Sequence, residues 1–230
     1  AQEVIVLLSP ECIYEDCKKK SLDEILSDIY SFKTSMGQLK SDIEYEAIDR
    51  SCRVIMCPSS ELQIDFMRQY IDAAKLAYEE RGGEYILSKS ERRSQEFEER
   101  LLALERIEFV IGGYFATHTK RVISFESSQV FLSDFLSVFS TFSPADMIFS
   151  KVLTMTRNEF IERIKSLYIG EWHRNYRNPY VLDGTQWEAT FSYSDGGRPI
   201  TFYGSNKYPY NFNDICKLMQ LKKKEVSEYQ

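Results

Sequence analysis

The sequence predicts an α+β protein in which helices pack on short antiparallel hairpins. Three observations lead to this class: apolar stripes at helical spacing, short alternating or β-branched runs bounded by glycine, and no repeated strand–helix–strand unit. The 230 residues are 43% hydrophobic and 28% charged, a balance typical of globular chains.

The N-terminal segment begins with a polar stretch at residues 12–20, which is expected to form a loop. Ser21 and Glu24 then have the spacing of a capping box, in which each side chain satisfies a free backbone N–H at a helix start. An apolar stripe follows as far as Phe32, which predicts a helix that Gly37 should weaken.

Two interpretations remain open for the next segment. Residues 43–48 and 53–57 could form a hairpin, or residues 42–49 could be helical. The clearest helical pattern covers 61–81, where apolar residues recur at alternating spacings of three and four. A second, largely charged helix is expected over 90–105.

The middle of the chain predicts two strands and a further helix. Residues 107–111 and 121–125 are rich in β-branched and aromatic residues, as strands are. Apolar residues within 130–142 fall on one face of a helix. Ser143-Pro144 resembles a helix start and is the best candidate boundary between two domains, 1–143 and 144–230.

The C-terminal domain is expected to be a helix–β-hairpin–helix module. Thr156 and Glu159 form a capping box at the start of its first helix. In 186–193 apolar and polar residues alternate, with Trp187, Ala189, Phe191 and Tyr193 on the side expected to be buried. A glycine-rich turn leads to a return strand after Pro199, and Asn211 or Asn213 can cap the last helix.

This module resembles one that recurs in uncharacterised bacterial proteins. The residues that carry the resemblance are 183–187, Asp195-Gly196 and 204–212, so it covers about the last quarter of the chain. The resemblance implies a bacterial or phage source and attaches no activity, ligand or catalytic residue.

Charge and cysteine content limit the possible functions. Residues 151–230 hold 12 basic and 9 acidic side chains, against 17 and 26 in residues 1–150, and the whole chain carries a charge of −6. General DNA binding is therefore disfavoured, because attraction to phosphates dominates that affinity. No apolar run is long enough to span a bilayer, and five cysteines in a chain of this size favour a reducing, cytoplasmic compartment.

Several enzyme classes lack their residues in this sequence. No phosphate-cradling glycine motif, zinc-protease motif or serine-hydrolase motif occurs, and only His118 and His173 could serve as histidine acid–base groups. We predict no catalytic residue and no cofactor. The paired spacing of Cys12 with Cys17 and Cys52 with Cys57 allows a zinc site, but buried or inert cysteines are the preferred interpretation.

A binding surface is predicted on two segments that flank the hairpin and combine aromatic with cationic side chains. Its residues are Trp172, His173, Arg174, Tyr176, Arg177, Tyr180, Lys207, Tyr208 and Tyr210. A short helical turn would point Arg174 and Arg177 to one side. In the alternative interpretation Trp172 and Tyr180 only pin an ordered loop, and the polar face of 186–192 is then the next candidate.

We therefore expect a cytoplasmic, non-catalytic protein of bacterial or phage origin that binds another macromolecule, with a protein favoured as the partner. The alternative is a nucleic-acid-binding or nucleic-acid-processing protein that uses the C-terminal basic and aromatic surface. The sequence does not determine the oligomeric state.

Overall fold

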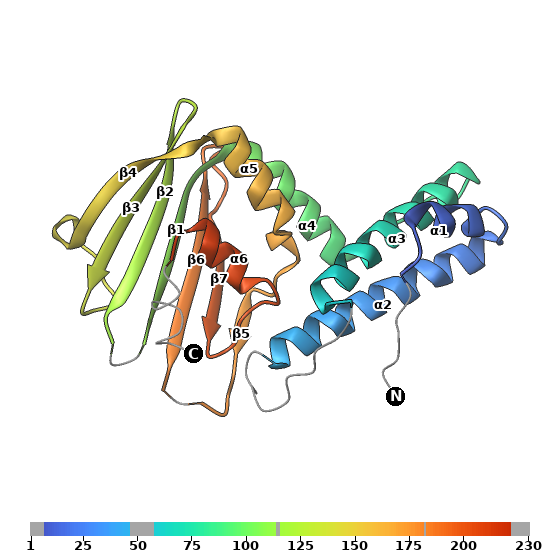
Figure 1. The fold of residues 1–230 in the computed structure, drawn as a ribbon. Coiled ribbons are helices and arrows are strands. Elements are labelled where there is room, and N and C mark those ends of the chain that lie inside the picture. Colours follow the sequence, from blue (N-terminus) through green and yellow to red (C-terminus); the bar gives the residue numbers. More distant parts are fainter. Residues whose placement is uncertain (1–6, 47–57, 114–115, 182, 222–230) are drawn as a thin grey trace. The chain divides into compact units, whose positions relative to one another are not determined.

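The computed structural model describes residues 7–46, 58–113, 116–181 and 183–221, and it confirms the α+β class (Figure 1). The chain divides into two compact units, residues 1–87 and 88–230. Within the described residues, no helix is both long and apolar enough to cross a membrane.

The first unit is helical. Its helices are α1 (Pro10–Cys17), α2 (Leu22–Glu46) and α3 (Ser60–Glu80), with α2 and α3 packed along each other (Figure 1). A small core joins them and consists of Cys17, Ile25, Ile29, Ile71, Ala74 and Ala77.

One expectation for this unit was wrong. Residues 12–20 are mostly helical, because Ser9 caps α1 through its side chain and Pro10 fits the first turn. Helix α2 continues through Gly37 to Glu46, which confirms the helical interpretation for residues 42–46. Residues 53–57 lie outside the described part of the chain.

The second unit is built on one seven-stranded sheet with strand order β4-β3-β2-β1-β6-β7-β5. Its strands are β1 (Leu104–Gly113), β2 (His118–Glu126), β3 (Gln129–Ser137), β4 (Met147–Thr156), β5 (Asn175–Arg177), β6 (Thr185–Tyr193) and β7 (Ile200–Ser205). Only the β5–β7 pair is parallel. Its α-helices are α4 (Lys89–Arg100), α5 (Arg157–Ser166) and α6 (Phe212–Leu218).

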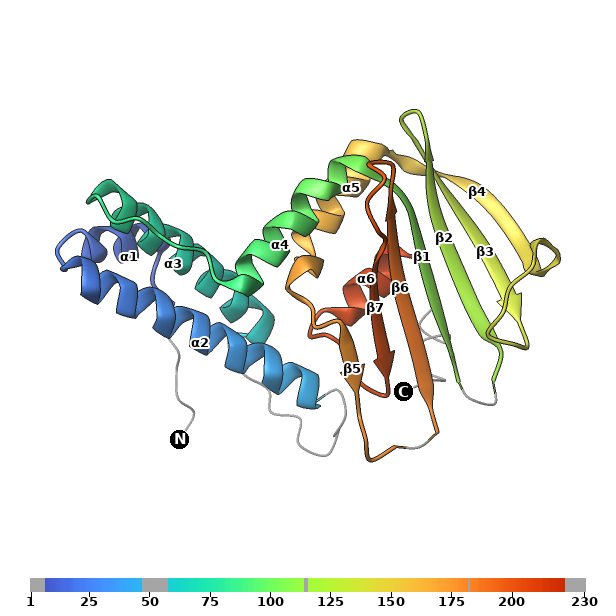
Figure 2. The ribbon, with the colours of Figure 1, turned by 180° about the vertical axis from the view of Figure 1, so that it is seen from behind.

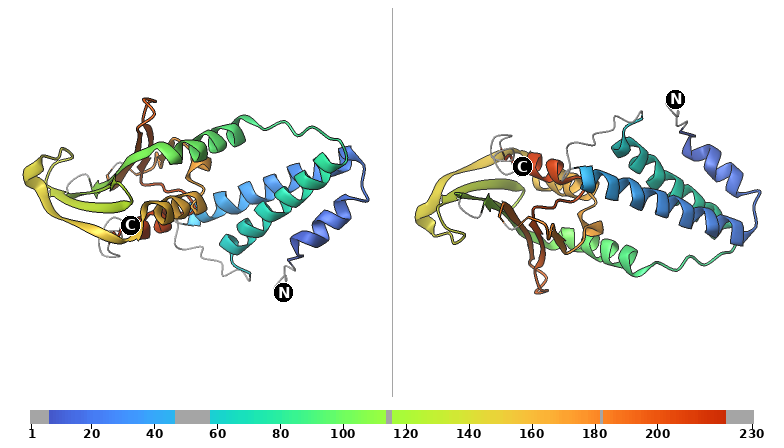
Figure 3. Two further views of the ribbon diagram at one scale, coloured as in Figure 1. Left: turned by 90° about the horizontal axis from the view of Figure 1, so that it is seen from above. Right: turned by 90° about the horizontal axis from the view of Figure 1, so that it is seen from below.

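All three of these helices pack on one face of the sheet, which we call the helix face. Phe97 of α4 contacts Phe191 and Phe202, while Phe160 of α5 contacts Phe125. Figure 2 shows the sheet from its other side, the open face, with α6 behind β7. Figure 3 shows that β4 and β3 curl relative to β6 and β7, as twisted sheets do.

Residues 130–142 do not form the predicted helix. They contain β3, whose buried Val130, Leu132 and Asp134 alternate with more exposed residues. Ser127 has a φ of 56° and makes the tight turn from β2 into β3. The same apolar residues suit both periodicities, and pairing with β2 and β4 decides for the strand.

The structure also differs from the predicted domain boundary. Ser143-Pro144 opens only a short 3-10 turn before β4, so it is no unit boundary. Strand β6 from the predicted C-terminal domain pairs with β1 along nine residue pairs, from Leu104↔Tyr193 to Gly113↔Thr185. Hydrogen bonding across the predicted boundary therefore joins residues 88–230 into one unit.

The predicted helix–hairpin–helix elements are present within this larger unit. Thr156 and Glu159 form the expected capping box of α5. Strand β6 buries every second residue, and β7 begins at Ile200, directly after Pro199. Asn211 precedes α6 but makes no capping bond with its side chain, which instead accepts a hydrogen bond from Trp172 Nε1 over 2.8 Å.

Residues within 183–187 and 204–212 have structural roles. Trp187 Nε1 donates to the carbonyl of Lys207 over 2.9 Å, and the indole leaves no room for a Cβ at Gly204. Gly184, with a φ of +147°, lies against Asn206 in the same way. These residues fold the loop after β7 back onto the sheet, where Tyr208 and Phe212 pack together.

Candidate functional site

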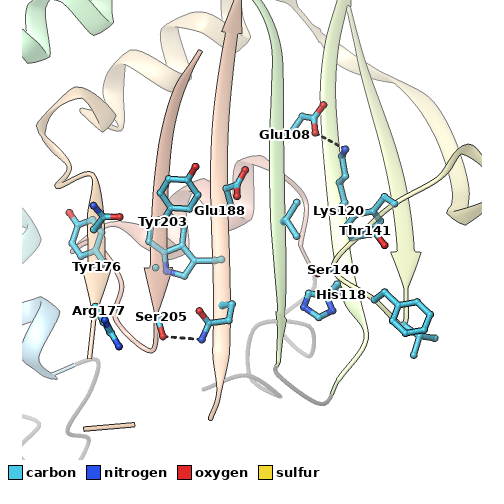
Figure 4. Close-up of a pocket in the computed structure, with 18 residues that line it drawn as sticks. Glu108, His118, Lys120, Ser140, Thr141, Tyr176, Arg177, Glu188, Tyr203 and Ser205 are labelled. Carbon is cyan, nitrogen blue, oxygen red and sulfur yellow. Dashed lines mark hydrogen bonds and ion pairs between the residues drawn. The ribbon is translucent and has the colours of Figure 1, made fainter. Parts of the chain in front are cut away.

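The open face of the sheet carries a groove of about 1230 Å³ (Figure 4). Its floor comes from β1, β2, β6 and β7, one wall from β5, and the other from residues 138–142 after β3. The groove is therefore assembled from segments between residues 108 and 205 of the chain.

Cross-strand pairing arranges the floor as two rows of side chains. Alternate residues of paired strands face the same side, so register alone determines which residues meet. The first row runs Phe135, Lys120, Val110, Glu188, Tyr203 and Asn175, and the second runs Ser137, His118, Gly112, Gln186, Ser205 and Arg177.

Glu108 and Lys120 form the main charge pair of the floor, with Oε2 and Nζ 2.5 Å apart (Figure 4). Arg106 Nε also lies 2.6 Å from Glu108 Oε1. Burial opposes ionisation of Glu108, but the hydrogen bonds and charges of Lys120 and Arg106 outweigh it and lower the pKa of the carboxyl. A carboxylate held ionised in this way is a poor proton donor near neutral pH.

Glu188 and Tyr203 lie next to each other in the first row. Glu188 accepts a hydrogen bond from Thr190 Oγ1 over 3.0 Å, and Tyr203 is exposed. Gln186 Nε2 donates to Ser205 Oγ over 2.9 Å (Figure 4). This half of the floor therefore offers both hydrogen-bond donors and hydrogen-bond acceptors beside the ring of Tyr203.

His118 lies over Gly112 in the second row. A Cβ at Gly112 would overlap the imidazole ring, so the glycine makes room for it. The Nδ1 atom of His118 is buried and has no hydrogen-bond partner in the described part of the chain.

The two walls differ in chemistry. The wall at 138–142 is largely apolar, and Phe139 is 72% exposed. The opposite wall carries Arg177 and Asn175 at the edge strand β5. A ligand that fits both walls has an apolar side and a polar or anionic side.

Three of the predicted binding residues belong to the protein core. Trp172, Tyr176 and Tyr208 are almost fully buried, and Trp172 and Tyr176 both contact the ring of Trp187. Their aromatic character, which suggested binding hot spots, reflects packing in the core. Tyr176 still borders the groove from the wall side.

Arg174 and Arg177 do not point to one side as a helical turn would require. Arg177 belongs to β5 and lines the groove, whereas the guanidinium of Arg174 lies 4.8 Å from the ring centroid of Phe202 on the helix face. An odd separation in extended backbone places two side chains on opposite faces. Burial, with a smaller effect of Arg93, lowers the pKa of Arg174.

The remaining predicted residues are dispersed. His173 and Tyr180 are exposed, Tyr180 at 93%, and Lys207 and Tyr210 are half-buried away from the groove lining. Tyr180 therefore does not pin the loop by packing, although Trp172 does. Of the nine predicted residues, the structure brings only Tyr176 and Arg177 to the groove.

The groove also contains residues that the sequence analysis did not select. Glu108, Lys120, His118 and Tyr203 come from three strands, β1, β2 and β7, and no local motif links them. The alternation in 186–192 did reveal Gln186 and Glu188, because a polar strand face adjacent to a buried face is visible in the sequence. Neighbouring strands were needed to reveal the rest.

Within the described residues, the side chains form no assembled site for a metal ion or for thiol chemistry. No group of three or more metal-ligating side chains occurs there. Cys12 is exposed and Cys17 is buried, while Cys52 and Cys57 lie outside the described part. Cys216 is buried, and burial raises the pKa of its thiol to about 12.

Comparisons of this chain with protein-family models, with curated proteins and with solved structures find no match.

Proposed function

We propose that the protein is a non-catalytic binding subunit that captures a segment of another protein in the open-face groove. The observation that carries the proposal is the groove itself: about 1230 Å³ in size, set on the open face of the sheet, with one apolar and one cationic wall. Concave sites of this kind with a few convergent polar groups commonly bind ligands.

The chemistry of the lining supports a polypeptide ligand. Exposed Phe139 and Tyr203 can contribute apolar area, while Arg177 is free to orient a carboxylate or carbonyl. Glu188 adds negative charge to the floor, which opposes a phosphate backbone, whereas the charge of Glu108 is compensated by Lys120 and Arg106. Nucleic acid, the alternative partner, is therefore less compatible with this groove. Bacterial or phage origin and a cytoplasmic location remain part of the proposal.

The test compares recovery of partner proteins by wild-type chain and by a groove variant that combines Phe139→Asp with Arg177→Glu. The full-length proteins are immobilised, and bound proteins from a lysate of the source cells are quantified by mass spectrometry. The matched control is Leu102→Asp, because Leu102 is 74% exposed but lies outside the groove. Specific partners should fall at least ~10-fold with the groove variant and stay constant with the control, as for central anchors.

A second measurement separates the two kinds of partner. Labelled DNA and RNA oligonucleotides are titrated at ~50 and ~200 mM salt. Tight binding that weakens steeply with salt and is lost in the groove variant would replace the protein-binding proposal with the nucleic-acid one. Equal recovery of all proteins by wild-type and groove variant would refute the groove as the binding surface.

A further inference from the structure

The two edges of the seven-stranded sheet are very different. β5, at one edge, has only three residues, of which the outer two, Asn175 and Arg177, are polar. β4, at the other edge, has ten residues and exposes Met147, Ile148, Phe149 and Val152. Edge strands are usually short, charged or covered, since unpaired backbone groups there recruit other strands. β5 follows this rule and β4 does not.

The regular part of β4 is short and well defined. Between two register shifts, residues Phe149 to Val152 pair in order with Asp134 to Phe131 of β3. Phe149 and Val152 in this segment are 39% and 49% exposed, and Ile148, at the register shift that precedes it, is 56% exposed. Contiguous exposed apolar side chains of this kind mark interaction sites.

One charge lies in the middle of this segment. Lys151 is the only charged residue of β4. It is exposed, and its Nζ lies 5.6 Å from the ring centroid of Phe149. Among the described residues, no carboxylate forms an ion pair with it. A strand added to β4 would place one of its side chains opposite Lys151.

This charge argues against a second copy of the chain as the added strand. A twofold antiparallel pairing that continues the same sheet face through 149–152 sets the two Lys151 side chains directly opposite or one diagonal step apart. Like charges at such positions destabilise a pair of strands. Each copy also carries a net charge of −6, which adds repulsion.

We propose that β4 is a docking edge for an extended segment of a partner protein, in which apolar residues alternate and an acidic residue faces Lys151. Strand addition supplies backbone hydrogen bonds for affinity, and the alternating side chains supply specificity. The inference rests on the proposed function only in taking a polypeptide as the ligand; it uses an edge separate from the groove.

The experiment selects binders from a displayed library of random twelve-residue peptides on the full-length protein. Peptides that bind β4 should share alternating apolar residues around one Asp or Glu. For each selected peptide, replacing that acid with Lys should weaken binding about two- to fivefold, the range of cross-strand charge pairs. The variant Lys151→Glu should reverse the preference, so that the Lys peptide binds more tightly than its acidic parent.

Lys89→Glu is the matched control, because it makes the same change in charge at an exposed site on α4. It should leave the acidic preference intact. An unchanged preference in Lys151→Glu, or selected peptides without a shared acid, would overturn the inference.

The groove variant and Lys151→Glu together separate this inference from the proposed function. Peptides that lose binding with the groove variant but ignore Lys151→Glu support the groove and refute the docking edge. Peptides with the opposite behaviour support the edge and not the groove. The remaining alternative occupant of β4 is a second copy of the chain, and sedimentation of the unliganded protein tests for it. A dimer at micromolar concentration that Ile148→Lys dissociates would show that a second copy occupies β4.

Discussion

At the scale of single residues, packing around Trp187 accounts for the tryptophan, glycine and asparagine positions of the C-terminal segment. The Trp187 ring packs against those of Trp172 and Phe212, and its Nε1 is bonded to the carbonyl of Lys207. Gly204 leaves room for the indole. Asn206 packs against Gly184 and directly precedes Lys207, whose carbonyl accepts the hydrogen bond from Trp187.

Replacing Trp187 with Ala should therefore cost roughly 3–5 kcal/mol of unfolding free energy, as for other large buried aromatics. Chemical denaturation of the purified variant measures this. Thr190→Ala, on the open face of the same strand, should stay within ~0.5 kcal/mol of wild type. Equal stability of Trp187→Ala and wild type would contradict the assigned packing.

Arg174 and Arg177 should have separable effects. Arg174→Ala removes the contact with Phe202 and should lower stability by about 1–2 kcal/mol, the scale of a partly desolvated cation–aromatic pair. Arg177→Ala should leave the melting temperature unchanged and reduce partner recovery through the groove. Thermal melting and partner recovery are measured on each single variant. A loss of stability in Arg177→Ala alone would contradict their placement on opposite faces.

At the scale of elements, two glycines show that backbone preference and side-chain packing can have opposite effects on stability. A Cβ at Gly37, in the middle of α2, would meet nothing within 4 Å, while one at Gly204 of β7 would overlap the indole of Trp187. Replacing glycine with alanine should therefore have opposite consequences for stability in the two elements.

Gly37→Ala should stabilise the first unit by about 0.5–1 kcal/mol, because alanine loses less backbone entropy in a helix. Gly204→Ala should destabilise the second unit by about 1–3 kcal/mol, as expected for overpacking. Denaturation curves of the two variants check both signs. Stabilisation by Gly204→Ala would show that the close approach to Trp187 is absent.

At the scale of the whole molecule, the main question is where the chain divides. Residues 88–230 contain the complete sheet and its own core, whereas a cut at residue 143 separates β1–β3 from β4–β7. Strand β6 would then lose its pairing with β1.

A fragment of residues 88–230 should unfold cooperatively, with strand content visible by circular dichroism. A fragment of residues 144–230 should lack a cooperative transition, because β4 and β6 lose their partners β3 and β1. Only the β6–β7 hairpin and the three-residue β5 stay paired, which is little more than a two-stranded hairpin, and such hairpins are marginal in water. Cooperative folding of the shorter fragment would restore the boundary expected from the sequence.

Much of the fold follows from local signals in the sequence. The α+β class, the helix at residues 61–81, the capping box of Thr156 and the β6–β7 hairpin all depend on neighbours within a few residues. Such interactions are readable because capping, turn geometry and periodicity are determined by the order of adjacent residues.

Tertiary structure decided the features that depend on distant partners. Residues of β3 suit a helix or a strand, and hydrogen bonds from β2 and β4 select the strand. The same long-range register brings Lys120, Glu188 and Tyr203 into one groove row. Packing against Trp187 and Phe212 buries Trp172 and Tyr208 in the core. By itself the sequence determined the local elements and the polar face of 186–192; the pairing of strands far apart in the chain determined which residues lie at the groove, since side-chain direction in a sheet is set by register.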